Sequence, residues 1–246
     1  MKHLLLGCIL CFVFRYYPAE AQSDKHLNII HNFIALVQKN DAQAIAAAVK
    51  YPFQRKYPLA AILNKEEFVE NYPLIFDDAL RNKIINSSAD KNWESVNQYR
   101  LTLENGLLWL DHKGRIKRIN YLPKKAQKYY QKLLRQDKQT LHKSVQKYWE
   151  PVLSWKSDQY KIRIDKESPY SYRLTLWPSN KSLESSPSTI IGGGQKEYEG
   201  IRGHQHFIFR QDNKVYSCKI TKTERYPEKM FLIQDQDAVS YSTIIP

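Results

Sequence analysis

Residues 27–37 read LNIIHNFIALV, and their apolar side chains recur at every third or fourth position. This spacing is typical of a helix that buries one face. Asn40 and Asp41 suit a helix N-cap, and residues 42–49 (AQAIAAAV) are strong helix formers. Because proline disfavours the α conformation in the residue before it, Pro52 ends this segment. The sequence therefore predicts two consecutive helices of one domain.

A third helix is predicted from Asn64, which is followed by Glu66 and Glu67 in the first turn, where acidic groups interact favourably with the helix dipole. After Leu80 the apolar period changes to two, which is typical of strands. The predicted strands are residues 83–86, 95–103, 107–111 and 115–121, with turns at 104–106 and 112–114. Helices followed by an antiparallel meander bury their apolar sides on one sheet face, which indicates an α+β domain.

Three motifs support a family resemblance: residues 33–36 (FIAL), the Asn40-Asp41 pair and residues 49–52 (VKYP). With this order of elements, residues 25–121 resemble the nuclear-transport-factor-2-like superfamily, which includes ketosteroid-isomerase-like and SnoaL-like proteins. The resemblance implies a cone in which helices cover a curved antiparallel sheet. It implies no particular activity, because function depends on the residues of a site rather than on the fold.

The resemblance implies that an enzyme built on such a cone would need a carboxylate or histidine that projects into the cavity between helices and sheet. The candidates are His31, at the edge of the apolar face of the first helix, and Asp111 with His112, just before a hairpin turn. Asp77 and Asp78 fit a helix boundary instead. We therefore consider His31, Asp111 and His112 as ligand-binding residues.

Residues 123–149 are predicted to form one amphipathic helix that connects two domains. Proline suits the first turn, and apolar residues recur along one side up to Tyr148. At ~1.5 Å per residue the helix would be on the order of 40 Å long. Its cations include Lys124, Lys125, Lys128, Lys132 and Arg135. They are interpreted either as the solvated side of a packed helix or as a contact for a polyanion or a membrane surface.

The remainder, residues 150–246, reads as a β domain with six or seven short strands. The predicted strands are residues 160–165, 170–177, 189–191, 204–210, 214–222, 230–234 and 238–245. The triglycine 192–194 is expected in a loop with unusual backbone angles. Short antiparallel strands with polar connections predict a small β-barrel or β-sandwich.

His204 and His206 are the most suggestive chemical pair in this domain, since residues two apart on a strand share a face. They are candidate ligand-binding residues, but no third ligand is placed to complete a metal site. Cys218 shares a strand face with Tyr216 and Ile220, which indicates a buried structural thiol. The common local signatures of hydrolases, zinc enzymes and dinucleotide-binding proteins are absent, so no catalytic residue, metal or cofactor is predicted.

Residues 1–21 have the pattern of a cleavable signal peptide: an early positive charge, an apolar run too short to span a bilayer, and a small-x-small site ending at Ala21. A competing interpretation is lipoprotein processing at Cys8, although only seven residues precede that cysteine and the apolar run continues beyond it. The chain from Gln22 contains no further apolar stretch of membrane-spanning length. An exported protein, periplasmic or extracellular, is therefore expected.

A length of 246 residues predicts two folded domains, here 22–122 and 150–246 around the linking segment 123–149. The net charge of +13 favours acidic partners or surfaces. We therefore expect an exported, non-catalytic binding protein of the cell envelope. The alternative is a small-molecule carrier or enzyme that uses the cone cavity, and a polyanion binder is a third hypothesis. Nucleic acid is the weakest candidate partner, because an exported chain without a nucleic-acid motif has little occasion to meet it.

Overall fold

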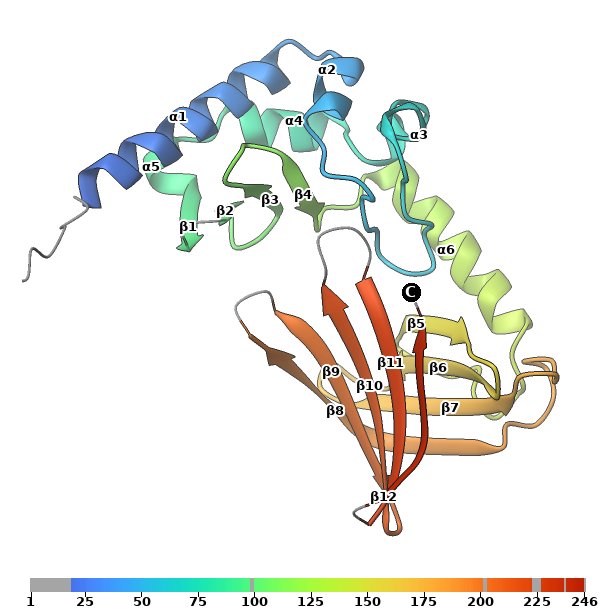
Figure 1. Cartoon of the computed structure of the whole chain (residues 1–246). Coiled ribbons are helices and arrows are strands. Elements are labelled where there is room, and N and C mark those ends of the chain that lie inside the picture. The colour runs from blue at the N-terminus through green and yellow to red at the C-terminus, as the bar shows by residue number, and fades with distance from the viewer. Residues whose placement is uncertain (1–18, 98–99, 201–202, 223–226, 237, 246) are drawn as a thin grey trace, which may run out of the picture.

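The computed structural model describes residues 19–97, 100–200, 203–222, 227–236 and 238–245. It contains an upper body of short helices around a four-stranded sheet and a lower body formed by an eight-stranded sheet (Figure 1). Most of the expected signal peptide lies outside these residues. The expected cleavage site after Ala21 falls in the first turn of the first helix, which begins at Ala19.

The helices of the upper body begin at polar caps. They are α1 (Ala19–Gln38), α2 (Ala42–Ala47), α3 (Lys65–Glu70), the 3-10 helix η1 (Tyr72–Leu74), α4 (Asp78–Ile85) and α5 (Ala89–Asn92). Asp41 accepts hydrogen bonds from two N–H groups of α2, Asn64 accepts one from α3, and Asp77 accepts one from α4. The predicted caps at Asp41 and Asn64 are confirmed, because these side chains satisfy N–H groups that a helix leaves unpaired.

The four-stranded sheet is an antiparallel meander in chain order. Its strands are β1 (Trp93–Asn97), β2 (Arg100–Leu103), β3 (Leu108–Asp111) and β4 (Ile116–Ile119). The predicted strand 95–103 is instead a hairpin of two strands. The predicted strand 83–86 lies mostly in α4, since Leu80 and Ile84 are one helical turn apart and both are fully buried.

The expected cone is wrong. The protein is mostly β, and most of its helices are short, which does not fit helices laid over one curved sheet beside a long helix. The space between helices and sheet is filled by side chains such as Phe33, Ile45, Phe68 and Leu110, all at most 2% exposed. Among the described residues, an interior packed in this way leaves little room for a ligand.

The predicted length of the connecting helix is also wrong. Helix α6 (Lys124–Gln139) has 16 residues and is about 24 Å long. It ends because Thr140 closes its last turn, with its hydroxyl donating to the carbonyl of Asp137. The chain then turns, and Leu141 and Val145 pack on Trp177. The apolar residues beyond Thr140, which suggested a longer helix, pack against Trp177 instead.

The second sheet has eight antiparallel strands, each paired with its neighbours in sequence. The strands are β5 (Glu150–Lys156), β6 (Tyr160–Lys166), β7 (Tyr172–Pro178), β8 (Thr189–Glu199), β9 (His204–Gln211), β10 (Lys214–Lys222), β11 (Pro227–Asp235) and β12 (Ala238–Ile245). The sheet curls into a half-barrel around an apolar core that includes Ile164, Leu174, Phe207 and Cys218 (Figure 1). The predicted closed barrel or two-sheet sandwich is therefore corrected to one curled sheet with two free edges.

The triglycine is part of β8 rather than a loop. The register between β7 and β8 shifts at this point, and Gly193 adopts a positive φ of 71°. A Cβ on Gly194 would lie 2.1 Å from the Phe209 ring carbon Cε1. Glycine is required here because the backbone of β8 approaches the aromatic core closely.

The two halves of the eight-stranded sheet differ in how their outer faces are covered. Arg163, Thr175 and Trp177 point away from the half-barrel core on β6 and β7, and each is at most 1% exposed. The end of α6 and the segment 140–149 cover them. No described helix packs on the outer face of β8–β12, so this half of the sheet is bare (Figure 1).

A buried network of charges joins α6 to β6 and β7. The Arg163 guanidinium donates to both carboxylate oxygens of Asp137, at 2.9 and 2.7 Å, and through Nε to Asp165. Arg173 donates to the other side of Asp165 at 3.1 Å and to the carbonyl of Val145. Burial alone would lower the pKa of Arg163, but the hydrogen bonds and charges of Asp137 and Asp165 outweigh it and raise that pKa. Arg163 therefore keeps its charge. Burial raises the pKa of the Asp165 carboxyl, and the charges and hydrogen bonds of Arg163 and Arg173 oppose that rise.

We expect Gly194→Ala to destabilise the β domain, because the added methyl group would overlap Phe209. Overpacking of this kind costs about 1–3 kcal/mol. The control is Gly193→Asn, since this position has open space around its Cβ and a backbone conformation that asparagine tolerates. Urea unfolding of the three proteins measures the difference. Equal free energies of unfolding for Gly194→Ala and the parent would contradict the close approach.

We also expect Asp137→Ala to be strongly destabilising, by about 3–5 kcal/mol, because it leaves the Arg163 charge buried with half of its partners removed. The control is Asp78→Ala. The Asp78 side chain is 91% exposed, and its ion pair with Arg81 is long, at 3.8 Å. Its loss should be at most about 1 kcal/mol. Chemical denaturation followed by tryptophan fluorescence compares the two, and similar losses would show that the Asp137–Arg163 contact has no special role.

Candidate functional site

Three polar side chains form a hydrogen-bonded chain on the bare outer face of β8–β10. His206 Nδ1 lies 2.8 Å from a carboxylate oxygen of Glu199, and His206 Nε2 lies within hydrogen-bond distance of the Ser217 hydroxyl. The strand register explains the arrangement, since His206 faces Glu197 on one neighbour and Lys219 on the other, and residues two apart share a face. We call Glu199, His206 and Ser217 the polar trio.

Lys219 completes this cluster from β10. Its ammonium group forms an ion pair with the second carboxylate oxygen of Glu199. The hydrogen bond and charge of Lys219, together with the hydrogen bond from His206, lower the pKa of the Glu199 carboxyl. Glu199 is therefore shared between two cation-forming partners rather than dedicated to His206.

The order of contacts in the polar trio is that of an acid, a base and a nucleophile, but the surroundings do not support acyl transfer. Such chemistry needs free N–H donors aimed at a developing oxyanion. Ser217 lies on an interior strand that is paired with both β9 and β11, so the nearby backbone N–H groups are used within the sheet. Its side chain also lies beneath its neighbours, with Ser217 only 7% exposed. The trio fits a cross-strand network that fixes the register of three strands.

His204 lies on the same face as His206, two residues away, as the sequence predicts. The structure brings Glu199 rather than a second histidine to His206. Within the described ranges no three His, Cys, Asp or Glu side chains lie close enough together to hold a metal ion. The sequence could not show the trio, because its members come from strands whose register is set by the turns between them.

The three candidates of the upper body do not line a common cavity. His31 is exposed on α1, and His112 is exposed in the turn between β3 and β4. Asp111 is 6% exposed and binds that turn, accepting from the N–H groups of Lys113 and Arg115 and from the Arg115 side chain. These contacts give Asp111 a structural role in the hairpin.

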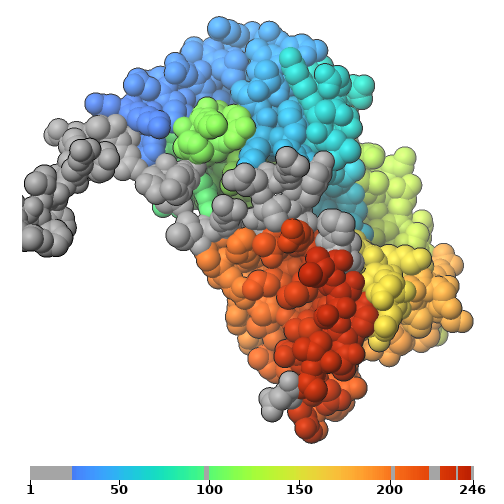
Figure 2. Space-filling model, viewed as in Figure 1, coloured from blue at the N-terminus to red at the C-terminus, as the bar shows by residue number. Residues whose placement is uncertain are grey.

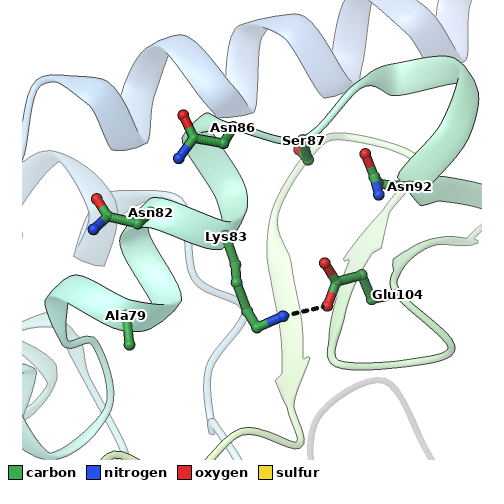
Figure 3. A pocket seen from close by; sticks show the side chains of 7 residues that line it. All are labelled: Ala79, Asn82, Lys83, Asn86, Ser87, Asn92 and Glu104. Atoms are coloured by element: carbon green, nitrogen blue, oxygen red, sulfur yellow. Dashed lines mark hydrogen bonds and ion pairs between the residues drawn. The ribbon is translucent and has the colours of Figure 1, made fainter.

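Two hollows on the described surface are small and open to solvent. One, of about 320 Å³, is lined by polar groups, and its Lys83 is paired with Glu104 at 2.8 Å (Figure 3). The other, of about 300 Å³, lies against the stacked rings of Tyr72 and Phe76. Both are at the lower limit of the volumes of ligand pockets and lack an enclosed apolar interior. Neither lies beside the polar trio.

Helix α6 carries the predicted basic residues on its exposed side. It lies along the outer surface between the two bodies, visible at the right in Figure 2. Ala126 and Tyr130 are buried, and the Tyr130 hydroxyl donates to the carbonyl of Tyr57. The exposed cations are Lys124, Lys125, Lys128, Lys132, Arg135 and Lys138. The arrangement presents a positive surface from a helix that is fixed on its other side.

Cys218 is fully buried in the β-domain core, which confirms the predicted structural thiol. Burial raises the pKa of this thiol well above its ordinary value. A thiol with a raised pKa is a poor nucleophile, because the thiolate is the reactive form. Cys218 therefore contributes to packing alone.

No family model matches the chain, and neither the curated proteins nor the solved structures compared with it include a match. Across the described part of the chain, no helix is both long enough and apolar enough to cross a lipid bilayer.

The Asp111 contacts predict a pH-dependent contribution to stability. Burial would raise the pKa of the Asp111 carboxyl, but hydrogen bonds from Arg115 and Lys113 outweigh it and lower that pKa. A carboxyl with a lowered folded-state pKa stabilises the fold above its unfolded-state pKa, near 4, and loses this effect as the pH falls through the folded-state pKa. We expect Asp111→Asn to cost about 1–3 kcal/mol at pH 7 and progressively less below about pH 4. Urea unfolding across this range tests it, and a difference independent of pH would contradict the assignment.

Proposed function

We propose that this chain is an exported, non-catalytic binding protein of the cell envelope, and that it holds a protein partner on the bare half of its eight-stranded sheet. The observation that carries the proposal is the unequal covering of the sheet. The outer face of β6 and β7 is sealed by α6 and the following segment, whereas β8–β12 has no such cover. Extended segments add to a free sheet edge through backbone hydrogen bonds, and the uncovered face beside that edge offers side chains for further contacts.

The bare face combines apolar and polar groups. Ser217 faces Ile208 on one side and Leu232 on the other, and the next row places Met230 between Lys219 and Ile244. The first three apolar residues are half-buried by their neighbours, whereas Ile244 is 69% exposed. The apolar side thus lies toward β12 and the polar trio toward β8.

Strand β12 is the free edge on the apolar side. Its sequence, AVSYSTII, has no charged residue and no proline. Val239 and Ile244 are 57% and 69% exposed. Monomeric proteins usually guard such an edge with charges, prolines or a covering loop, because unpaired N–H and C=O groups recruit other strands. Strand β12 lacks the charges and prolines among these guards, although its register against β11 shifts at Ile233 and Gln234. Its Tyr241 hydroxyl donates to Ser157 and Asp158. The uncharged edge favours a strand-adding partner.

The proposed occupant is an extended segment of an acidic partner protein. The net charge of +13 favours an acidic partner, whereas two copies of this chain would repel one another. Export is supported by the sequence pattern of residues 1–21, and the non-catalytic role by the lack of free backbone donors around Ser217. The alternative of a ligand cavity in the upper body has less support, because that interior is packed.

The test replaces the two exposed apolar residues of β12, as Val239→Lys with Ile244→Lys. The matched control is Leu63→Lys with Val96→Lys, which are 58% and 49% exposed in the upper body. Parent and control chains should capture the same partner from an envelope extract, and the β12 variant should bind it at least roughly tenfold more weakly. Hydrogen exchange on the purified complex should show slowed exchange in β12.

Three results would overturn the proposal. One is equal capture by the β12 variant, and another is the absence of any partner for the parent chain. The third is sedimentation of the parent alone as a dimer that the β12 substitutions dissolve, because the occupant would then be a second copy.

A further inference from the structure

We infer that the exposed side of α6 is a binding surface for an anionic polysaccharide. This surface is separate from β12 and does not depend on the partner proposed above. Charge is distributed unequally around the helix. Six cations are exposed, and the one acidic residue of the helix, Asp137, is turned inward to Arg163 and Tyr148.

The outward charges have no counter-ions in the structure. Across the described residues, the ion pairs include none formed by Lys124, Lys125, Lys128, Lys132 or Arg135. Lys138 lies over the ring of Tyr148, 4.7 Å from its centroid. Five neighbouring cations therefore repel one another on a helix whose own carboxylate is occupied elsewhere. An anionic ligand would relieve that repulsion.

The cations lie in two adjacent rows, because helical residues three or four apart are neighbours. One row is Lys124, Lys128, Gln131 and Arg135, and the other is Lys125, Tyr129, Lys132 and Gln136. From Lys124 to Arg135 a row extends about 17 Å at ~1.5 Å per residue. The surface is thus narrow and linear, which suits a chain of repeated negative charges.

The residues between the cations favour a sugar chain over the other anionic partners. Gln131, Gln136 and Tyr129 are exposed among the lysines and can hydrogen-bond hydroxyl groups. Membrane-surface helices turn bulky apolar residues toward the lipid, whereas α6 buries Ala126 and Tyr130 against the protein. Protein interfaces are depleted in lysine. Binding of single-stranded nucleic acid uses several stacking aromatic rings, and this side of α6 exposes Tyr129 alone.

The experiment uses heparin as a probe, with anionic lipid vesicles, polyglutamate and single-stranded DNA as the other arms. The test variant is Lys128→Gln, Lys132→Gln and Arg135→Gln. Its matched control is Lys39→Gln, Lys91→Gln and Lys113→Gln, three exposed lysines of the upper body. Both variants lose three charges, and glutamine preserves helix propensity in α6. Circular dichroism confirms that each variant is folded.

The parent and the control should bind heparin more weakly as salt increases, and the α6 variant should bind on the order of tenfold or more less tightly at each salt concentration. Equal weakening in the test and control variants would overturn the inference, since net charge alone would then explain binding. Tighter binding of vesicles, polyglutamate or DNA than of heparin through α6 would overturn it as well. The β12 variant should lose the protein partner and still bind heparin. This result would show that the α6 surface and the β12 edge bind independently.

Discussion

The bidentate ion pair between Asp137 and Arg163 fixes the orientation of α6 relative to the eight-stranded sheet. It ties the end of α6 to β6, and through Asp165 and Arg173 it reaches the backbone of the segment that covers β7. A buried ion pair adds little net stability compared with apolar packing, because its charges must first be removed from water. It fixes a single orientation, however, since any other orientation would leave a buried charge without a partner.

This orientation has consequences on both sides of the helix. With Asp137 turned inward, the outward side of α6 contains only cations and neutral polar residues. The chain beyond Thr140 is directed onto Trp177, so the outer face of β6 and β7 is closed while β8–β12 is left open. The position of the Asp137 carboxylate is thus compatible with both the basic surface of α6 and the uncovered face of β8–β12.

Local chemistry in the sequence predicted local structure well. The caps at Asp41 and Asn64, the β3–β4 hairpin turn and most strands of the β domain follow from residues within a few positions of each other. Features that depend on distant partners were not predictable. The apolar period of residues 123–149 could not show that Leu141 and Val145 pack against Trp177, which is distant in the sequence. The strand-like pattern near residue 84 was misleading, because Ile84 is buried in the core as part of a helix. The same holds for the polar trio, whose members are neighbours only because of strand register.

The chain order of the two sheets bears on how the protein is made. Strands β1–β4 and β5–β12 each pair only with the strand before and the strand after, so nearly every sheet contact is a hairpin contact. Proteins dominated by contacts close in sequence form them quickly, because short loops lose little entropy on closing. Each sheet can therefore form strand by strand once the chain begins to fold. Arg163 follows Asp137 by 26 residues and lies in β6, the second strand of its sheet, so the buried charges can meet before β8–β12 have formed. The orientation of α6 on this sheet can thus be set early in folding.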